Sequence, residues 1–367
     1  MSNRYPMDYL VISRMANAHI LEKADSFVEV ARDLFGVQAQ IQNAAAIAYC
    51  LRLQNGTISQ YFKQYEQMKL VRLWGIRTTL HSYCYEDWNL VLSQVSLADN
   101  WFRKKMIKQG CDLEPLVQRA VSCLQGIDVF DRDYLIQKGI PAEYLGPWGD
   151  FLIELNNRGI ICHNTSNDIH KKKFINATKY VSFNTNTINL HQEKEKKEIA
   201  RRYFGAFSPA TIKDFAHWLG CTITQAKSYL ALIQEELIEV ECNGKRYYIL
   251  NIMKTRISSV YEKYKDNSEC WLLSKFDPLL LAYDDKSWIV DSQYQNSVWK
   301  SAGHVEGVIV KNLKAIGTWK YSLRKGHIGF ELFPFCKSIE PIDLYLFEKF
   351  KSIACYMECN LDYIRMN

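Results

Sequence analysis

The chain has 367 residues, of which 48% are hydrophobic and 23% are charged. This balance excludes an intrinsically disordered protein, and the length is too great for one small core, so we expect several domains. The formal net charge of +6 permits a polyanionic partner, although many enzymes that bind no nucleic acid carry a similar charge.

The chain contains 11 cysteines, an odd number, and they are scattered singly along it. The closest pair, Cys355 and Cys359, has no second pair at a matching spacing, so we expect no zinc ribbon, no iron–sulfur cluster and no other metal or cofactor. The first ten residues hold no apolar signal core, and no apolar run is long enough to span a bilayer. We therefore expect a soluble, cytoplasmic protein with reduced thiols and no membrane partner.

The first part of the chain predicts helices followed by extended chain. Apolar spacing indicates helices over residues 11–20 and 26–35, and a third helix that starts after Gln40. The stretch 71–85 is rich in β-branched and aromatic residues and predicts a strand. Helices followed by a strand form the outline of a winged helix.

The middle of the chain repeats this outline. Several helical stretches are followed by two extended pieces, residues 159–163 and 174–181. The polar loop between these pieces carries Lys171, Lys172 and Lys173, which we interpret as a wing tip near a DNA phosphate. A solvated basic loop is the equally simple alternative.

The next region gives the strongest pattern in the chain. Ser208 is placed to cap a helix, and Thr222 with Gln225 forms a capping box for the helix that follows. The dipeptide Asn243-Gly244, flanked by hydrophobic residues, predicts a β-hairpin. Helices followed by this hairpin predict a winged helix-turn-helix.

The recognition helix of this module is a poor candidate for reading DNA. Lys227 lies on its exposed side, but Glu235 and Glu236 follow closely and would repel the phosphate backbone. We therefore expect the module to act as a scaffold, because a winged-helix fold alone does not establish sequence-specific binding.

From Cys270 onward, short aromatic and β-branched runs such as 287–290 and 327–333 alternate with turn residues. They predict a small antiparallel sheet or barrel that is finished by a helix near 343–358. The predicted fold class is therefore α+β, with tandem winged-helix (helix-turn-helix) modules and a C-terminal antiparallel β-barrel-like domain. The expected module boundaries are 1–95, 96–189, 190–266 and 267–367.

Five segments, spread in order over most of the chain, carry a wider pattern. They are DLFGVQAQIQNAAAIAYCLRL, LVRLWGIRTTLHSYCYEDW, YFGAFSPATIKDFAHWLG, LLSKFDPLLLAYDDKSWIV and the stretch from VWKSAGHVEGVIV to AIGTWKY. Together they resemble the AlkZ-like (YcaQ-like) family of DNA glycosylases. The resemblance implies tandem winged helices and a C-terminal β-domain around duplex DNA. It also implies hydrolysis of the N-glycosidic bond of N7-alkylated purines, including some interstrand cross-links, in DNA repair.

The catalytic motif of that family is two polar residues on either side of an apolar one, and here it is Gln38-Ala39-Gln40. Some branches of the family carry aspartate at the second polar position, whereas this chain keeps glutamine. Gln42 continues the alternation, but the family's motif does not include it. One departure is Thr78, where the resemblance leads us to expect glycine, so the local backbone geometry is in question at that residue.

Glutamine suits this chemistry although its amide cannot act as a general base near neutral pH. An N7-alkylated guanine already carries a positive charge and leaves as a neutral base. The enzyme must then orient a water molecule and stabilise the positive charge that develops on the sugar. Two amide oxygens can do both by positioning and electrostatics, so we assign Gln38 and Gln40 jointly to these tasks. No lysine lies beside the motif to form a Schiff base, so we expect a monofunctional glycosylase.

The spacing of the two glutamines gives a structural test. Residues two apart lie on opposite sides of a helix but on the same side of an extended segment. For Gln38 and Gln40 to face one sugar, residues 38–40 must be non-helical or the helix must begin near Gln40. Gly36, placed to end the preceding helix as its C′ residue, permits that break. The alternative is that both glutamines are ordinary helix-surface residues.

Further basic residues are candidates for DNA contact. The best-placed group forms a basic patch on one predicted helix and consists of Arg103, Lys104, Lys105 and Lys108. Arg77 and His81 follow the motif and are placed to face DNA, with ordinary strand packing as the alternative for His81. His304 follows Gly303 on an expected hairpin that would approach the minor groove.

These observations make double-stranded DNA with alkylated bases the expected partner, and a monomer the expected state. A non-enzymatic winged-helix DNA-binding protein, such as a transcriptional regulator, is the main alternative. It would bind a sequence irrespective of alkylation and would form a dimer on paired half-sites. A protein-interaction scaffold without DNA affinity is a third interpretation that the small basic excess leaves open.

Overall fold

The computed structural model describes residues 4–95, 100–147, 149–166, 172–180, 193–301, 303–336 and 344–367. The chain forms two compact units. The larger unit comprises Met1–Tyr61 and Lys196–Asn367, and the smaller unit comprises Phe62–Glu195. The finer division into four modules stays a prediction. Among the described helices, none combines the length and apolar character needed to cross a membrane.

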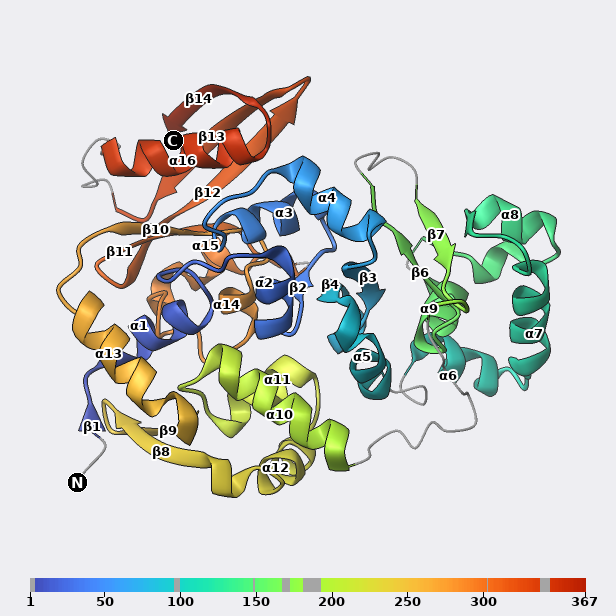
Figure 1. Cartoon of the computed structure of the whole chain (residues 1–367), viewed down its shortest axis with the longest axis horizontal. Coiled ribbons are helices and arrows are strands. Elements are labelled where there is room, and N and C mark those ends of the chain that lie inside the picture. Colours follow the sequence, from blue (N-terminus) through green and yellow to red (C-terminus); the bar gives the residue numbers. More distant parts are fainter. Residues whose placement is uncertain are drawn as a thin grey trace. The chain divides into compact units, whose positions relative to one another are not determined.

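The N-terminal part of the larger unit is helical, as the apolar spacing predicts (Figure 1). Its elements are β1 (Arg4–Tyr5), α1 (Met7–Asn17), α2 (Phe27–Asp33), β2 (Val37–Gln38), α3 (Gln42–Cys50) and α4 (Ile58–Glu66), the last of which leads into the smaller unit. Ser26 caps α2, because its hydroxyl accepts the backbone N–H of Glu29 at 3.1 Å.

The helices α1 and α2 both end in a left-handed residue that is not glycine. His19 has φ 59° and Phe35 has φ 47°. After α2, the N–H of Gly36 donates to the carbonyl of Ala31 at 2.8 Å, which completes a Schellman motif with Phe35 at C′. The expectation that Gly36 itself holds C′ is therefore wrong by one residue. Phe35 is buried against Trp218, with ring centroids 6.1 Å apart, and this burial offsets the backbone cost.

Five strands of the smaller unit form a sheet in the order β4-β3-β6-β7-β5. They are β3 (Leu70–Trp74), β4 (Leu80–Cys84), β5 (Val129–Phe130), β6 (Ile161–Asn164) and β7 (Lys173–Asn176), and neighbouring strands are antiparallel. The helices are α5 (Trp88–Gln94), α6 (Trp101–Lys108), α7 (Glu114–Cys123), α8 (Arg132–Gln137) and α9 (Asp150–Asn157). The apolar faces of α6, α7, α8 and α9 share one core with the sheet, which includes Trp74, Phe102 and Phe151.

The stretch 71–85 is a hairpin rather than one strand. Strands β3 and β4 are joined by a tight turn in which Arg77 has φ 54° and Thr78 has φ 56°. Two consecutive positive φ angles match a type I′ turn, whose twist suits a hairpin. At Gly75 an added Cβ would lie 2.1 Å from the hydroxyl of Tyr83, so only glycine permits this close approach.

Thr78 is strained, at the position where the resemblance leads us to expect glycine. A left-handed conformation costs an L-residue about 1–2 kcal/mol, and a β-branched side chain is especially unfavourable there. We expect Thr78→Gly to raise the free energy of unfolding of the smaller unit by roughly 0.5–1 kcal/mol, after the greater entropy of the unfolded glycine is subtracted. Thr78→Ala, which keeps the strain but loses the β-branch, is the control. Urea denaturation that shows no gain for glycine over alanine would contradict this expectation.

The next helices along the chain form a module with a hairpin. The elements are α10 (Glu193–Phe207), α11 (Ile212–Leu219), α12 (Ile223–Ala231), β8 (Leu237–Cys242), β9 (Lys245–Leu250) and α13 (Lys254–Tyr264). The capping box of Thr222 and Gln225 and the turn at Asn243-Gly244 are present as predicted. The cap predicted at Ser208 is wrong: Thr211 caps α11, because Asp214 gives it a complete capping box. Strand β1 adds to β8 in parallel.

The C-terminal part is an open sheet and not a barrel. Its strands β10 (Cys270–Leu273), β11 (Gly307–Lys311), β12 (Lys314–Arg324), β13 (His327–Pro334) and β14 (Asn360–Met366) pair in that order. The barrel-like prediction is therefore corrected: in the described residues the order runs from β10 at one edge to β14 at the other without closure. Helix α16 (Leu344–Tyr356) confirms the predicted helix and packs against this sheet in Figure 1.

The prediction also missed that α16 carries the chain back to a last strand. Strand β14 pairs with β13 in parallel, which requires a crossover, and α16 supplies it. The run 287–290, expected to be extended, is a turn whose residues Trp288, Ile289 and Val290 are all buried. Two short helices, α14 (Pro278–Leu281) and α15 (Gln295–Val298), flank this turn.

A fully buried ion pair ties α3 to the segment after β10. Arg52 donates from Nη2 to Oδ1 of Asp277 at 2.7 Å and from Nη1 to Oδ2 at 3.0 Å, and both side chains have zero exposure.

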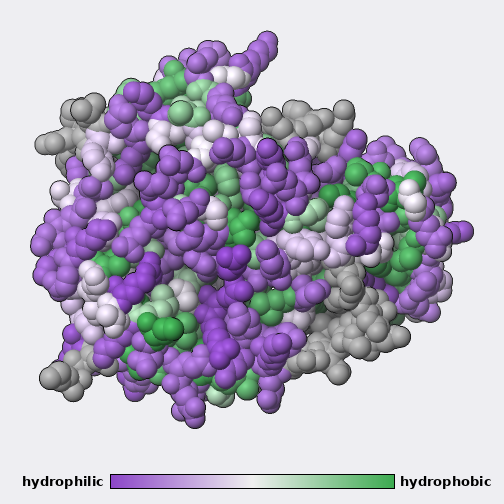
Figure 2. Space-filling model, viewed as in Figure 1, coloured by the Kyte–Doolittle hydropathy of each residue, from purple (hydrophilic) through white to green (hydrophobic). Residues whose placement is uncertain are grey.

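The surface is polar: the face in Figure 2 is mostly hydrophilic, with hydrophobic residues in small separate areas.

Candidate functional site

The glutamine pair lies in a non-helical segment between two helices. Gln38 ends strand β2, and α3 begins only at Gln42, after Ile41 in an extended conformation. The prediction that residues 38–40 are non-helical is therefore confirmed. The break arises because α2 ends in the Schellman motif, where Gly36 follows with φ 93°.

Burial alternates strictly along this segment. Val37 and Ala39 have zero exposure, whereas Gln38 is half-buried and Gln40 is exposed. In extended chain, side chains two apart point to the same face, so the two glutamines share one face while Val37 and Ala39 anchor the other in the core. The packing of Val37 and Ala39 thus fixes the backbone from which the two glutamine side chains project.

The surroundings of the segment differ at its two ends. Upstream, Arg202 of α10 donates from Nη1 to the carbonyl of Arg32 in the last turn of α2 at 2.9 Å. Downstream, the side-chain Oε1 of Gln42 is buried and has no hydrogen-bond partner within the described residues. A buried acceptor of this kind costs about 1–3 kcal/mol unless a water molecule reaches it. Gln42 is not part of the family's catalytic motif.

The predicted basic patch on α6 is only partly as expected. Lys104, Lys105 and Lys108 are exposed. The side chain of Arg103 is 19% exposed and forms an ion pair with the fully buried Glu154 of α9. Arg103 thus neutralises Glu154 inside the smaller unit, because an unpaired carboxylate in the core would lower the free energy of unfolding. Contact of Lys104, Lys105 and Lys108 with DNA phosphates stays a prediction.

Strands β6 and β7, which flank the predicted wing tip, pair with each other. Lys172 and Lys173 are exposed at the start of β7, and Lys171 lies outside the described residues. His304 is also exposed, in a turn where the N–H of Lys300 donates to its carbonyl at 2.8 Å. Its ring lies 6.0 Å from that of Phe276. These positions suit contact with a partner, and their role in DNA binding stays a prediction.

The two residues of the β3–β4 hairpin that were expected to face DNA differ from each other. Arg77 is half-buried in the turn, and burial lowers the pKa of its guanidinium while Tyr83 acts in the opposite direction. His81 is buried, and its Nδ1 lies 3.0 Å from the carbonyl oxygen of Thr79. This environment favours the packing alternative for His81, since the side chain is not presented to solvent.

Buried histidines make the smaller unit sensitive to acid. Burial lowers the pKa of His81 to about 4 and holds the pKa of His163 well below its usual value. Between pH 6.5 and about 4 the unfolded chain binds protons that the folded chain does not, so stability falls as the pH drops through this range. At about 1.4 kcal/mol per unit, His81 alone accounts for a loss of about 3 kcal/mol.

The variant His163→Phe tests this dependence. The Nε2 of His163 is buried without a hydrogen-bond partner among the described residues, and its ring lies 4.4 Å from that of Trp74 and 4.9 Å from that of Phe174. Phenylalanine keeps the ring contacts and cannot be protonated. We expect a smaller loss of urea stability between about pH 7 and pH 5 than in the wild type. An equal loss in both proteins would show that His163 does not contribute.

Two groups of interacting side chains in the larger unit were not predicted from the sequence. One is the buried pair of Arg52 and Asp277. The other is a cluster of His19, Glu29 and Asp33, whose ligand atoms all lie within 4.8 Å of one another. The only local signal for the cluster is the spacing of Glu29 and Asp33, which places both on one face of α2.

The chain was compared with known families, proteins and structures. The model of the family described as DNA glycosylase AlkZ-like matches residues 31–341. A relative from Streptomyces sahachiroi, an interstrand DNA cross-link repair glycosylase, is 23% identical over 312 residues, which cover 80% of this chain and 81% of the relative. The solved structure of Streptomyces sahachiroi DNA glycosylase AlkZ has a TM-score of 0.82 and 20% identity, covering 99% of this chain and 100% of that one.

The structural likeness shows that the fold is shared over almost the whole length of both chains. The family match includes the glutamine segment and extends through both compact units. Because it covers most of the sequence, this protein belongs to the AlkZ-like family of DNA glycosylases and is itself a DNA glycosylase.

Proposed function

We propose that this DNA glycosylase acts in DNA repair by hydrolysing the N-glycosidic bond of N7-alkylated purines in duplex DNA, and that interstrand cross-links are among its substrates. The observation that carries the proposal is the alternation of burial at residues 37–40, which puts Gln38 and Gln40 on one outward face. The name of the Streptomyces relative, an interstrand DNA cross-link repair glycosylase, supports the substrate class.

In the proposed mechanism the two amides act together on one sugar. One amide oxygen accepts a hydrogen bond from the attacking water, and the other lies near the anomeric carbon, where positive charge develops. The alkylated base leaves without protonation, because its N7 substituent already makes it cationic. The proton that the attacking water loses passes to solvent. No residue of the segment has to gain or lose a proton, which fits amide side chains.

The test uses a duplex with a single N7-methylguanine and a second duplex with one interstrand N7–N7 guanine cross-link. Wild-type protein should release the free base from the first and convert the second to separable strands. The variants Gln38→Ala and Gln40→Ala should bind both duplexes but break the N-glycosidic bonds far more slowly. Tight binding by the wild type without any base release, on either duplex, would instead indicate a DNA-binding module without this activity.

The lysines of α6 give a second expectation about the same partner. If Lys104, Lys105 and Lys108 contact phosphates, replacing all three by glutamine removes up to three counterion-releasing contacts. The slope of log K against log salt should then become shallower by up to about 3, at about 0.9 for each contact. Arg119→Gln, an exposed arginine hydrogen-bonded to the Gly139 carbonyl, is the control. Fluorescence anisotropy at several salt concentrations measures the slope, and an unchanged slope in the triple variant would exclude α6 from the interface.

A further inference from the structure

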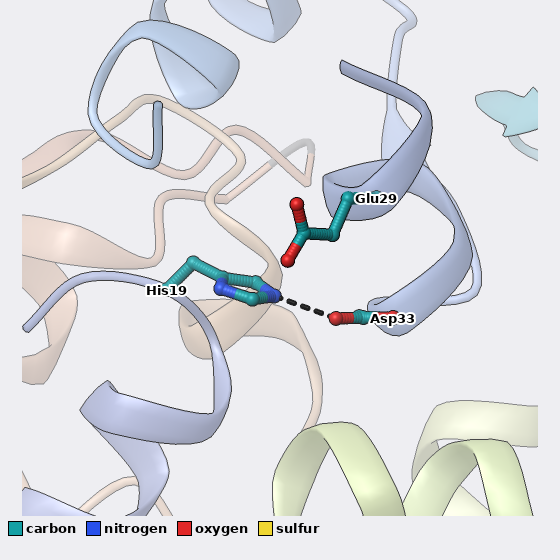
Figure 3. A group of neighbouring side chains, drawn as sticks. All are labelled: His19, Glu29 and Asp33. Atoms are coloured by element: carbon teal, nitrogen blue, oxygen red, sulfur yellow. Dashed lines mark hydrogen bonds and ion pairs between the residues drawn. The ribbon is translucent and has the colours of Figure 1, made fainter. Parts of the chain in front are cut away.

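We propose that His19, Glu29 and Asp33 form a binding site for a divalent transition-metal ion of the Zn²⁺ type. The three side chains come from two elements of the larger unit: His19 follows α1, and the two carboxylates lie one turn apart on α2. Figure 3 shows both carboxylates facing the imidazole. One ligand atom from each residue lies within 4.8 Å of the other two.

The donor set suits such an ion. Imidazole nitrogen and carboxylate oxygen are ordinary ligands of Zn²⁺, with metal–ligand distances of about 2.0–2.2 Å. Three protein ligands and a water molecule would complete a tetrahedral site. The Nε2 of His19 lies 2.8 Å from Oδ2 of Asp33, so these two atoms are already closer together than a shared tetrahedral ion requires. These two atoms therefore have to separate by about 0.5 Å and the Glu29 carboxylate has to move inward, both by small side-chain rotations.

The ligands are held in place by the local backbone. The N–H of His19 donates to the carbonyl of Ala16 at 3.1 Å, which holds the backbone of His19 at the end of α1. The Oε2 of Glu29 accepts the N–H of Asp25 at 2.9 Å, so this carboxylate is oriented by a second group, as metal ligands commonly are. The side chain of His19 is only 10% exposed, whereas that of Asp33 is 43% exposed and leaves an entry path.

Most of the positive charges around the cluster are paired with acidic residues outside it. The three residues line a cavity of about 590 Å³ together with several arginines. Three of these arginines form ion pairs with other acidic residues: Arg201 with Glu236, Arg202 with Glu198, and Arg256 with Glu22. The fourth, Arg32, is exposed. Two close carboxylates repel each other, and a divalent cation neutralises both.

A bound ion would join the end of α1 to α2. Helix α2 has only 7 residues, and Asp33 lies five positions before Gln38. The site would thus brace the element that leads directly into the glutamine segment. The inference does not depend on the proposed reaction, because it concerns metal affinity and the stability of the larger unit.

The experiment titrates the full-length protein, purified with chelator and then freed of it, with Co²⁺ while the visible absorption is recorded. One equivalent should bind and give a ligand-field spectrum without the thiolate charge-transfer band that cysteine coordination would add. Zn²⁺ should displace it. A saturating Zn²⁺ concentration should also raise Tm by about 5 °C, because the ion binds only the folded chain.

Two ligand variants and one control decide the outcome. His19→Gln and Asp33→Asn should each weaken Co²⁺ binding by at least about 10-fold and remove the rise in Tm. Asp25→Asn, an exposed neighbour whose backbone N–H is kept, should bind as the wild type does. Circular dichroism confirms that each variant is folded. Absence of binding in the wild type, equal binding in the ligand variants, or a thiolate band would each overturn the proposal.

Discussion

Alanine at Gln38 or at Gln40 is expected to lower the single-turnover rate of N7-methylguanine release by about 100- to 1000-fold, the usual effect of removing one preorganised polar group from a transition state. In the proposed mechanism both side chains project from the same face of residues 37–40 and act on one water and one sugar. The double variant should therefore be little worse than either single variant, because residues that act as a unit are strongly non-additive.

Three comparisons make this expectation specific. Gln40→Asp should keep much of the activity, since a carboxylate oxygen still accepts a hydrogen bond and some family branches carry aspartate there. Gln42→Ala tests an equivalent amide that begins α3 and lies outside the motif, and it should change the rate by less than the motif variants do. Anisotropy with the same duplex should show unchanged affinity for all variants. A rate that survives in the double variant would remove both glutamines from the mechanism.

Loss of Arg52 should be the most destabilising single substitution considered for this protein. Arg52→Ala leaves the carboxylate of Asp277 unpaired at zero exposure, and breaking a buried ion pair in this way costs about 3–5 kcal/mol. The guanidinium also donates to the carbonyl of Ala48 at 2.9 Å. Asp277 in turn accepts the N–H groups of Ser274 and Leu279, so the pair holds α3 and α14 together.

Urea denaturation of Arg52→Ala and Arg52→Lys measures this effect. Lysine should recover only part of the loss, because a single ammonium cannot reproduce the two parallel hydrogen bonds to the carboxylate. Arg4→Ala is the control: it removes an ion pair with Glu241 in which the side chains are 73% and 36% exposed, and it should cost less than about 1 kcal/mol. Similar losses for Arg52→Ala and Arg4→Ala would show that burial of the pair adds little.

The features that the sequence predicted correctly depend on contacts between close neighbours along the chain. The capping box of Thr222 and Gln225 and the hairpin turn at Asn243-Gly244 use hydrogen bonds and φ angles within a few residues. The break before α3 follows from the same local rules, and it places the glutamine pair on an extended segment. The family assignment likewise required only the order and spacing of its segments.

Other features depend on partners far apart along the chain, and these the sequence could not specify. Arg103 is neutralised by Glu154, 51 positions away, and Arg52 pairs with Asp277, 225 positions away. Contacts between distant segments also decide whether His81 is exposed and whether the C-terminal strands close into a barrel. They decide as well that His19 lies beside α2. Periodicity and local propensity predict most of the helices and hairpins and which of their faces are apolar, because these follow from contacts within a few residues and from the hydrophobic effect. Which charges meet, and which sheet edges pair, is decided only when packing brings those elements together and burial makes an unpaired group costly.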